Sequence, residues 1–249
     1  MNIPGPIMKY RDCLLTFALA MGLIAPAAAA DVNTKPVYKA KPAPAPQPWN
    51  PWQVRLRALG VLPDGSGSTV NVAGAPALSS PNSGLKIGNS VVPELDISYY
   101  LTRNWAAELI LGVTPHDVTG TGALANLNIG RAWLLPPTLT VQYHFTDFGA
   151  FQPYVGAGIN YTVFFDQSAG NAPLGALPAI TQLKLNSTVG AAVQFGFDYM
   201  LDQHWGVNVD AKWLYLEPGY TANDSAALPI SGTAHINPWL VGGGLTYRF

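Results

Sequence analysis

Apolar and polar residues alternate with a period of two in eight separate runs between residue 52 and the end of the chain. In the clearest run, residues 183–201, Val189 and Phe197 fall on one face and Thr188 and Asp198 on the other. One face of each run is uniformly apolar, whereas the other mixes charged residues, amides and glycine. Such alternation predicts β-strands whose two sides meet different environments. The chain is therefore expected to be all-β.

A membrane barrel accounts for this pattern better than a soluble barrel does. Charged residues are only 11% of the chain, less than half the usual share of a soluble domain. No stretch after residue 30 approaches the roughly 20 apolar residues of a membrane helix, which leaves the closed β-barrel as the membrane architecture. A soluble eight-stranded barrel of the lipocalin type would put its apolar residues inside. Here the apolar face is the uniform one, so we expect it to face lipid.

The connections between the runs alternate in length. Residues 63–88, 115–134, 166–181 and 216–235 form long connections, and residues 102–104, 146–152 and 202–204 form short ones. Outer-membrane barrels combine an even number of strands with long extracellular loops and short periplasmic turns. The sequence thus predicts an eight-stranded antiparallel transmembrane β-barrel over residues 52–249. It would lie in the bacterial outer membrane with both chain ends in the periplasm.

The first 51 residues precede the predicted barrel. A basic start, an apolar core and the small-residue pattern Ala28-Ala29-Ala30 predict that residues 1–30 are a signal peptide. Residues 31–51 are rich in proline, alanine and lysine. That composition favours an extended periplasmic tail, because it cannot bury a core.

Three stretches resemble the OmpW family of small outer-membrane proteins: LPPTLTVQYHF (135–145), PYVGAGINYTVFFD (153–166) and NPWLVGGGLTYRF (237–249). The stretch WQVRLRALGVLPD (52–64) fits the first strand of that family. The resemblance covers most of residues 52–249, and it implies eight strands, a narrow lumen and uptake of small hydrophobic compounds. The last strand ends in Tyr247 and Phe249 and resembles the signal that the barrel assembly machinery reads in outer-membrane proteins.

The inward faces of the strands predict a lumen with two levels. An eight-stranded barrel is just wide enough for side chains to fill its interior. Since unpaired buried charges are costly, we expect an ionic plug of mutually paired residues near the periplasmic end: Arg55, Arg57, Glu94, Asp96, Glu108, Asp198, Asp210, Lys212 and Arg248. Nearer the extracellular end we expect an apolar cup, which is either a ligand site or ordinary packing: Leu59, Val61, Val92, Ile110, Phe164, Leu214 and Leu240.

These features favour uptake of small hydrophobic solutes. An apolar solute cannot cross an ionic plug cheaply, so we expect sideways release into the bilayer. Proline breaks such as Pro136-Pro137 would help, because proline cannot donate to a strand ladder. The alternative is a display barrel without transport, whose loops bind external partners.

Other classes of function find little support. The histidines lack metal-ligand spacing, so no catalytic residue, metal or cofactor is expected. The formal net charge of −1 gives no sign of nucleic-acid binding. The expected partners are outer-membrane lipid, lipopolysaccharide and the barrel assembly machinery.

Overall fold

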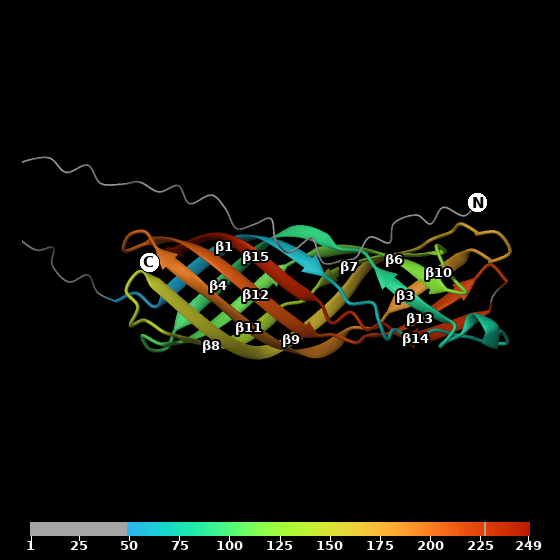
Figure 1. Cartoon of the computed structure of the whole chain (residues 1–249), viewed down its shortest axis with the longest axis horizontal. Coiled ribbons are helices and arrows are strands. Elements are labelled where there is room, and N and C mark those ends of the chain that lie inside the picture. Colours follow the sequence, from blue (N-terminus) through green and yellow to red (C-terminus); the bar gives the residue numbers. More distant parts are fainter. Residues whose placement is uncertain (1–48, 227) are drawn as a thin grey trace, which may run out of the picture. The chain divides into compact units, whose positions relative to one another are not determined.

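Eight antiparallel strands close into a barrel in the computed structural model, which describes residues 49–226 and 228–249 (Figure 1). The predicted signal peptide and most of the predicted tail, residues 1–48, lie outside the described residues. Each barrel strand pairs with the next along the chain, and the last strand returns to pair with the first. The predicted fold class is confirmed. The strands are β1 (Trp52–Leu62), β4 (Ser90–Tyr100), β5 (Trp105–Gly112), β8 (Thr138–His144), β9 (Phe151–Ala169), β11 (Thr188–Met200), β12 (Trp205–Tyr215) and β15 (Trp239–Arg248).

The apolar faces of these strands point outward. Val91 is 80% exposed and Val189 is 67% exposed. A continuous apolar surface of this kind is unfavourable in water, so it fits a barrel whose outside faces lipid. At the end that carries the short turns 101–104, 145–150 and 201–204, aromatic rings pack edge to face on the outside. We call this the turn end. Trp52 packs against Tyr99 at 4.9 Å and Trp205 against Tyr247 at 4.8 Å between ring centroids, which is typical of an aromatic girdle at a membrane–water interface.

The four long connections build a second body of strands at the opposite end of the barrel, which we call the extension. In Figure 1 the labels β3, β6, β10, β13 and β14 lie there, away from the C-terminus. One sheet joins β3 (Ser83–Ile87), β6 (Thr114–Gly122) and β7 (Asn128–Leu135) to the distal half of β9. The other contains β10 (Ile180–Leu185), β13 (Gly219–Asp224), β14 (Pro229–Thr233) and β2 (Asn71–Val72), and the short 3-10 helix η1 (Pro76–Leu78) follows β2.

The sequence reading predicted the long connections but not the strands within them. Some of these strands are very short, with two residues in β2 and five in β14, and Val118 is the only large apolar residue in β6. A period-two pattern needs several uninterrupted residues before it can be recognised. Pairing between segments far apart in sequence therefore decided this part of the fold.

Side chains rather than a backbone ladder join the two extension sheets beside β9. The β9–β11 ladder ends at Thr162, and the distal half of β9 lies next to β10. The backbone of β9 bulges at Asp166, which has a positive φ of 45°. Gln167 follows directly after this bulge. Gln167 Oε1 accepts a hydrogen bond from the Leu185 backbone N–H at 2.5 Å, and its Nε2 donates to the Phe164 carbonyl at 3.2 Å. We call this contact the Gln167 seam.

The barrel wall is also interrupted near Pro136. The β5–β8 ladder ends at the pair Ile110–Thr138, and the β6–β7 ladder begins at the pair Thr114–Leu134. Residues 111–113 and 135–137 face each other between these ladders without being paired in either. Pro136 and Pro137 have no N–H group to donate, so a continuous ladder cannot form across them. We call this interruption the proline gap.

Candidate functional site

Arg55 organises the half of the lumen that lies nearest the turn end. Its guanidinium donates two hydrogen bonds to the Asp198 carboxylate, from Nε to Oδ1 at 3.0 Å and from Nη2 to Oδ2 at 2.7 Å. It also pairs with Glu108, and all three side chains are fully buried. Ser98 and Gln142 each donate a further hydrogen bond to Glu108 at 2.7 Å. Paired and hydrogen-bonded in this way, the charges tolerate burial.

Arg57 and Lys212 form the next level of charge. Arg57 pairs with Glu94 at 2.9 Å and with Asp96, and Lys212 Nζ lies 2.8 Å from Glu94 and 3.0 Å from Asp210. The two levels together contain three cations and five carboxylates, and we call them the ionic floor. The structure brings together eight of the predicted plug residues: Arg55, Arg57, Lys212, Glu94, Asp96, Glu108, Asp198 and Asp210.

Neutral side chains that the sequence reading left out of the plug connect its two levels. Gln194 Nε2 donates to Glu108 at 3.1 Å and to Asp210 at 2.8 Å, and Tyr154 Oη donates to Asp210 at 2.7 Å. Both side chains lie on inward positions of predicted strands. The alternation of inward and outward residues along each strand could therefore have identified them as lumen residues. A Cβ on Gly196 would lie only 2.7 Å from the Tyr154 hydroxyl oxygen, which explains a glycine at that inward position.

Arg248 lies below the ionic floor rather than within it, which corrects the prediction that it belongs to the paired plug. The β1–β15 register places it opposite Gln53, one inward position beyond Arg55. Its guanidinium donates to Gln53 Oε1 at 2.7 Å, to Tyr100 Oη at 3.0 Å and to Gln152 Oε1 at 3.1 Å. These acceptors are neutral, so Arg248 closes the mouth of the turn end by hydrogen bonds.

Apolar side chains cover the other side of the floor. Leu59, Val61, Val92, Leu214 and Leu240 pack in one cluster with Ala192. A cavity of about 20 Å³ beside this cluster is lined by Ile110 and by Glu94 and Lys212 of the floor. Six of the seven predicted cup residues are therefore together, and we call them the apolar cup. Phe164 is the exception, because β9 continues for 19 residues and carries it into the extension.

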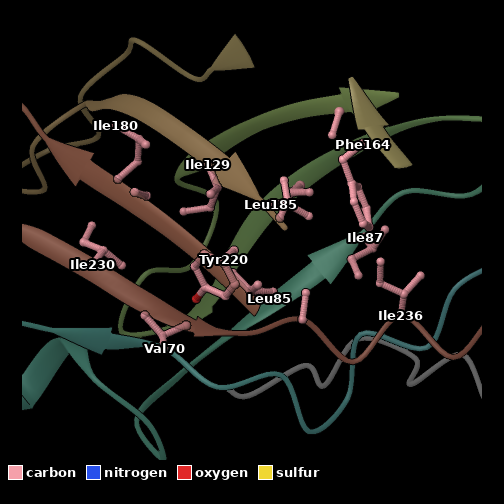
Figure 2. Close-up of a cluster of buried hydrophobic side chains, with 14 of the residues drawn as sticks. Val70, Leu85, Ile87, Ile129, Phe164, Ile180, Leu185, Tyr220, Ile230 and Ile236 are labelled. Atoms are coloured by element: carbon pink, nitrogen blue, oxygen red, sulfur yellow. The ribbon is translucent and has the colours of Figure 1, made fainter. Parts of the chain in front are cut away.

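The extension has a separate apolar core, which the sequence reading missed. Figure 2 shows side chains from both sheets pointing toward one another, with Leu85 and Ile87 of β3 near Leu185 of β10 and Phe164 of β9. Two cavities of about 30 Å³ each lie within it. We call the second, which is bounded by Phe164 and Leu185, the distal cavity. The remaining buried members of the core include Val70, Val72, Val118, Leu124, Leu127, Ile129, Ile180, Tyr220, Ile230 and Ile236.

An open polar cleft lies on the outside of the same core. It has a volume of about 730 Å³ and runs between residues 63–69 and β3. Leu85 and Ile87 line both this cleft and the distal cavity. One strand thus separates solvent from the apolar interior of the extension.

The solvent-facing surface of the extension carries an exposed counterpart to the buried ion pairs. Arg131 donates to both Asp117 carboxylate oxygens, at 2.6 and 3.2 Å, and the hydrogen bond from the guanidinium lowers the pKa of Asp117.

Residues 49–226 and 228–249 contain no group of three or more histidine, cysteine or acidic residues that could hold a metal ion. Over the same residues, no helix is long and apolar enough to cross a membrane.

The sequence profile of the OmpW family matches residues 51–249. The uncharacterized outer-membrane protein y4mB of Sinorhizobium fredii is 48% identical over 97% of this chain and 97% of its own length. Outer membrane protein W of Vibrio cholerae is 37% identical over 79% of this chain and 87% of its own. The dibenzothiophene metabolism operon protein PahQ of Pseudomonas aeruginosa is 27% identical over 68% of this chain and 74% of its own.

A solved structure has the same architecture. The crystal structure of the outer membrane protein OprG from Pseudomonas aeruginosa superposes with a TM-score of 0.71 at 28% sequence identity, covering 80% of this chain and 95% of that one. The match extends over the barrel and much of the extension, since the barrel alone is shorter than the aligned length.

Proposed function

Because the chain belongs to the OmpW family of outer-membrane proteins, we propose that it takes up small hydrophobic molecules through its apolar interior and releases them sideways into the bilayer. In this proposal the extension faces the outside of the cell. The turn end, which holds the start of β1 and Phe249, faces the periplasm. Long connections outside and short turns inside are the usual arrangement of outer-membrane barrels.

The observation that carries the proposal is the order of environments along the interior. The core of the extension is apolar, the apolar cup follows, and the ionic floor closes the barrel below it. A small molecule that buries about 200 Å² of apolar surface gains on the order of 5 kcal/mol before the cost of association. That gain allows weak, exchangeable binding, as a conduit requires.

The ionic floor makes passage along the barrel axis unfavourable. An apolar molecule at that level would separate Lys212 from Glu94 and Asp210, which leaves buried charges unpaired. The proline gap offers a route at the level of the cup. Gly112, Thr114 and Pro136 from the two sides of the gap line the cavity beside Leu59 and Leu240, so a solute in the cup reaches lipid where the wall has no ladder.

The name of one relative agrees with an apolar cargo. PahQ is named for an operon of dibenzothiophene metabolism, and dibenzothiophene is an apolar aromatic heterocycle with one sulfur atom. In the proposal, outer-membrane lipid and lipopolysaccharide surround the apolar exterior, and lipid is the acceptor of the released solute. The assembly machinery recognises the terminal strand through Tyr247 and Phe249.

Uptake by cells carrying single variants tests the proposal. Leu59→Asp places a charge in the cup, where it is costly beside an apolar solute, and uptake of a panel of hydrophobic compounds should fall to the level of cells without the protein. Ala125→Asp is the matched control, because Ala125 lies in an exposed turn of the extension, and uptake should be unchanged. Heat-modifiable gel migration shows whether each barrel is folded.

The same experiment separates transport from display. If folded Leu59→Asp imports the panel as well as the parent does, the cup is only packing. The barrel would then present its extension to external partners without transport, and the uptake proposal would be wrong.

A further inference from the structure

His116 is a polar residue in the wall of the distal cavity that the proposed function does not explain. Its side chain is 3% exposed, and it lines the cavity with Ile87, Val118 and Phe164. His116 Nδ1 lies 2.6 Å from the Gly88 carbonyl oxygen, whereas Nε2 has no hydrogen-bond partner among residues 49–226 and 228–249. A buried nitrogen without a partner costs free energy, so it requires an explanation.

The contact with Gly88 fixes the chemical character of the free nitrogen. A carbonyl oxygen can only accept, so Nδ1 carries the proton that it donates. Burial lowers the pKa of His116 and favours the neutral ring. Nε2 is then a hydrogen-bond acceptor with a free lone pair.

The rest of the cavity wall cannot satisfy that acceptor. Tyr220 is the other lining residue with a polar side-chain atom, and its hydroxyl donates to the Thr69 carbonyl oxygen at 2.9 Å. A buried water needs two to four polar partners to be stable, and His116 Nε2 would supply one. A molecule that is mostly apolar and brings a single donor fits this environment better than water.

We propose that the distal cavity binds small apolar molecules that carry one hydroxyl or N–H donor, such as aromatic alcohols, with the donor directed to His116 Nε2. This inference rests on the proposed uptake function and names the class of solute that the extension selects. Molecules of the same size without a donor would leave Nε2 unpaired. Selection would therefore act before a solute reaches the apolar cup.

The closed cavity must widen to admit an aromatic ring, because its volume is about 30 Å³. The wall beside it can open at modest cost. Leu185 lines the cavity and is held to β9 by the side-chain amide of Gln167 rather than by a ladder of backbone hydrogen bonds. Moving β10 away from β9 would break the Gln167 contacts and the backbone hydrogen bond from Asn171 N–H to the Ile180 carbonyl oxygen, while the ladders of both sheets would stay intact.

Binding of a matched pair of compounds tests the inference. The full-length mature protein is placed in lipid nanodiscs, and equilibrium dialysis measures binding of 1-naphthol and of 1-methoxynaphthalene against empty nanodiscs. The two probes share the ring system, and only 1-naphthol has a donor. A net hydrogen bond predicts that 1-naphthol binds roughly three- to tenfold more tightly.

Three variants assign the preference to His116. His116→Phe removes the acceptor and should bring the two affinities together, whereas His116→Gln can donate to Gly88 and accept from the ligand, so it should retain the preference. Tyr220→Phe removes the other hydroxyl of the cavity and should also retain it. If His116→Phe does not fold, equal binding of the two probes by the wild type would still overturn the inference.

The possible failures are distinguishable. If the wild type binds both probes equally, or if folded His116→Phe keeps the preference, the inference is overturned while uptake of apolar molecules stands. If the wild type binds neither probe above empty nanodiscs, both the inference and the proposed function are overturned.

Discussion

Replacing Arg55 by methionine should destabilise the barrel far more than the same replacement at Arg131. Both arginines make two hydrogen bonds to one aspartate, Arg55 to Asp198 and Arg131 to Asp117. The side chains of the first pair are 0% exposed, and those of the second are 56% and 63% exposed. The two sites share the two-bond arginine–aspartate contact and differ in burial and in the second partner of Arg55, Glu108.

The magnitude follows from what the Arg55→Met change leaves behind. The ionic floor would keep two cations against five carboxylates, and breaking a buried pair by removing one partner costs about 3–5 kcal/mol. Asp198 would still accept hydrogen bonds from Asn208 at 2.9 Å and Thr246 at 2.8 Å, and Glu108 would keep Ser98 and Gln142. These donors favour the lower end, about 3 kcal/mol. Arg131→Met should cause no measurable change, because exposed pairs contribute little.

The assay is urea unfolding of purified protein in lipid vesicles, followed by the gel mobility of unheated samples. The triple change Arg55→Met, Asp198→Asn and Glu108→Gln removes the unpaired charges together and should recover most of the lost free energy of unfolding. Equal destabilisation by Arg55→Met and Arg131→Met would refute the reasoning. It would mean that the floor is solvated rather than a buried, paired network.

Three further predictions concern the proline gap, the distal cavity and the last strand. Changing Pro136 and Pro137 together to alanine supplies two backbone N–H groups, so the ladder can close and uptake should fall without loss of stability; unchanged uptake would place the exit elsewhere. Burial lowers the pKa of His116, so the folded protein binds its proton less readily than the unfolded chain, and stability should be lost as the pH falls below about 6.5. That loss should be smaller in His116→Gln, and an identical pH dependence of the free energy of unfolding would contradict it. Phe249 is 52% exposed and packs on Tyr247, so Phe249→Ser should lower the amount of protein assembled in the outer membrane while protein refolded in detergent keeps its stability; equal assembly would show that the terminal aromatic is not read.

The sequence by itself determined the direction of each side chain in the barrel. In a strand, neighbouring residues point to opposite sides, so parity alone put Arg55 inside and Leu56 outside. The structure agrees, with Arg55 fully buried and Leu56 59% exposed. The number of strands and the alternation of long and short connections are also local properties, because turns and apolar runs can be read without knowing which strands pair.

Only the tertiary structure decided the height of each residue and the identity of its neighbours. Arg248 and Phe164 both point inward, as predicted. The β1–β15 register nevertheless puts Arg248 below the ionic floor, and the length of β9 carries Phe164 into the extension. The distal cavity brings Ile87 against Phe164, Leu185 and Ile236, from four segments that meet only after the chain folds. Contacts between such distant segments depend on register and closure of the whole sheet, and no local period contains that information.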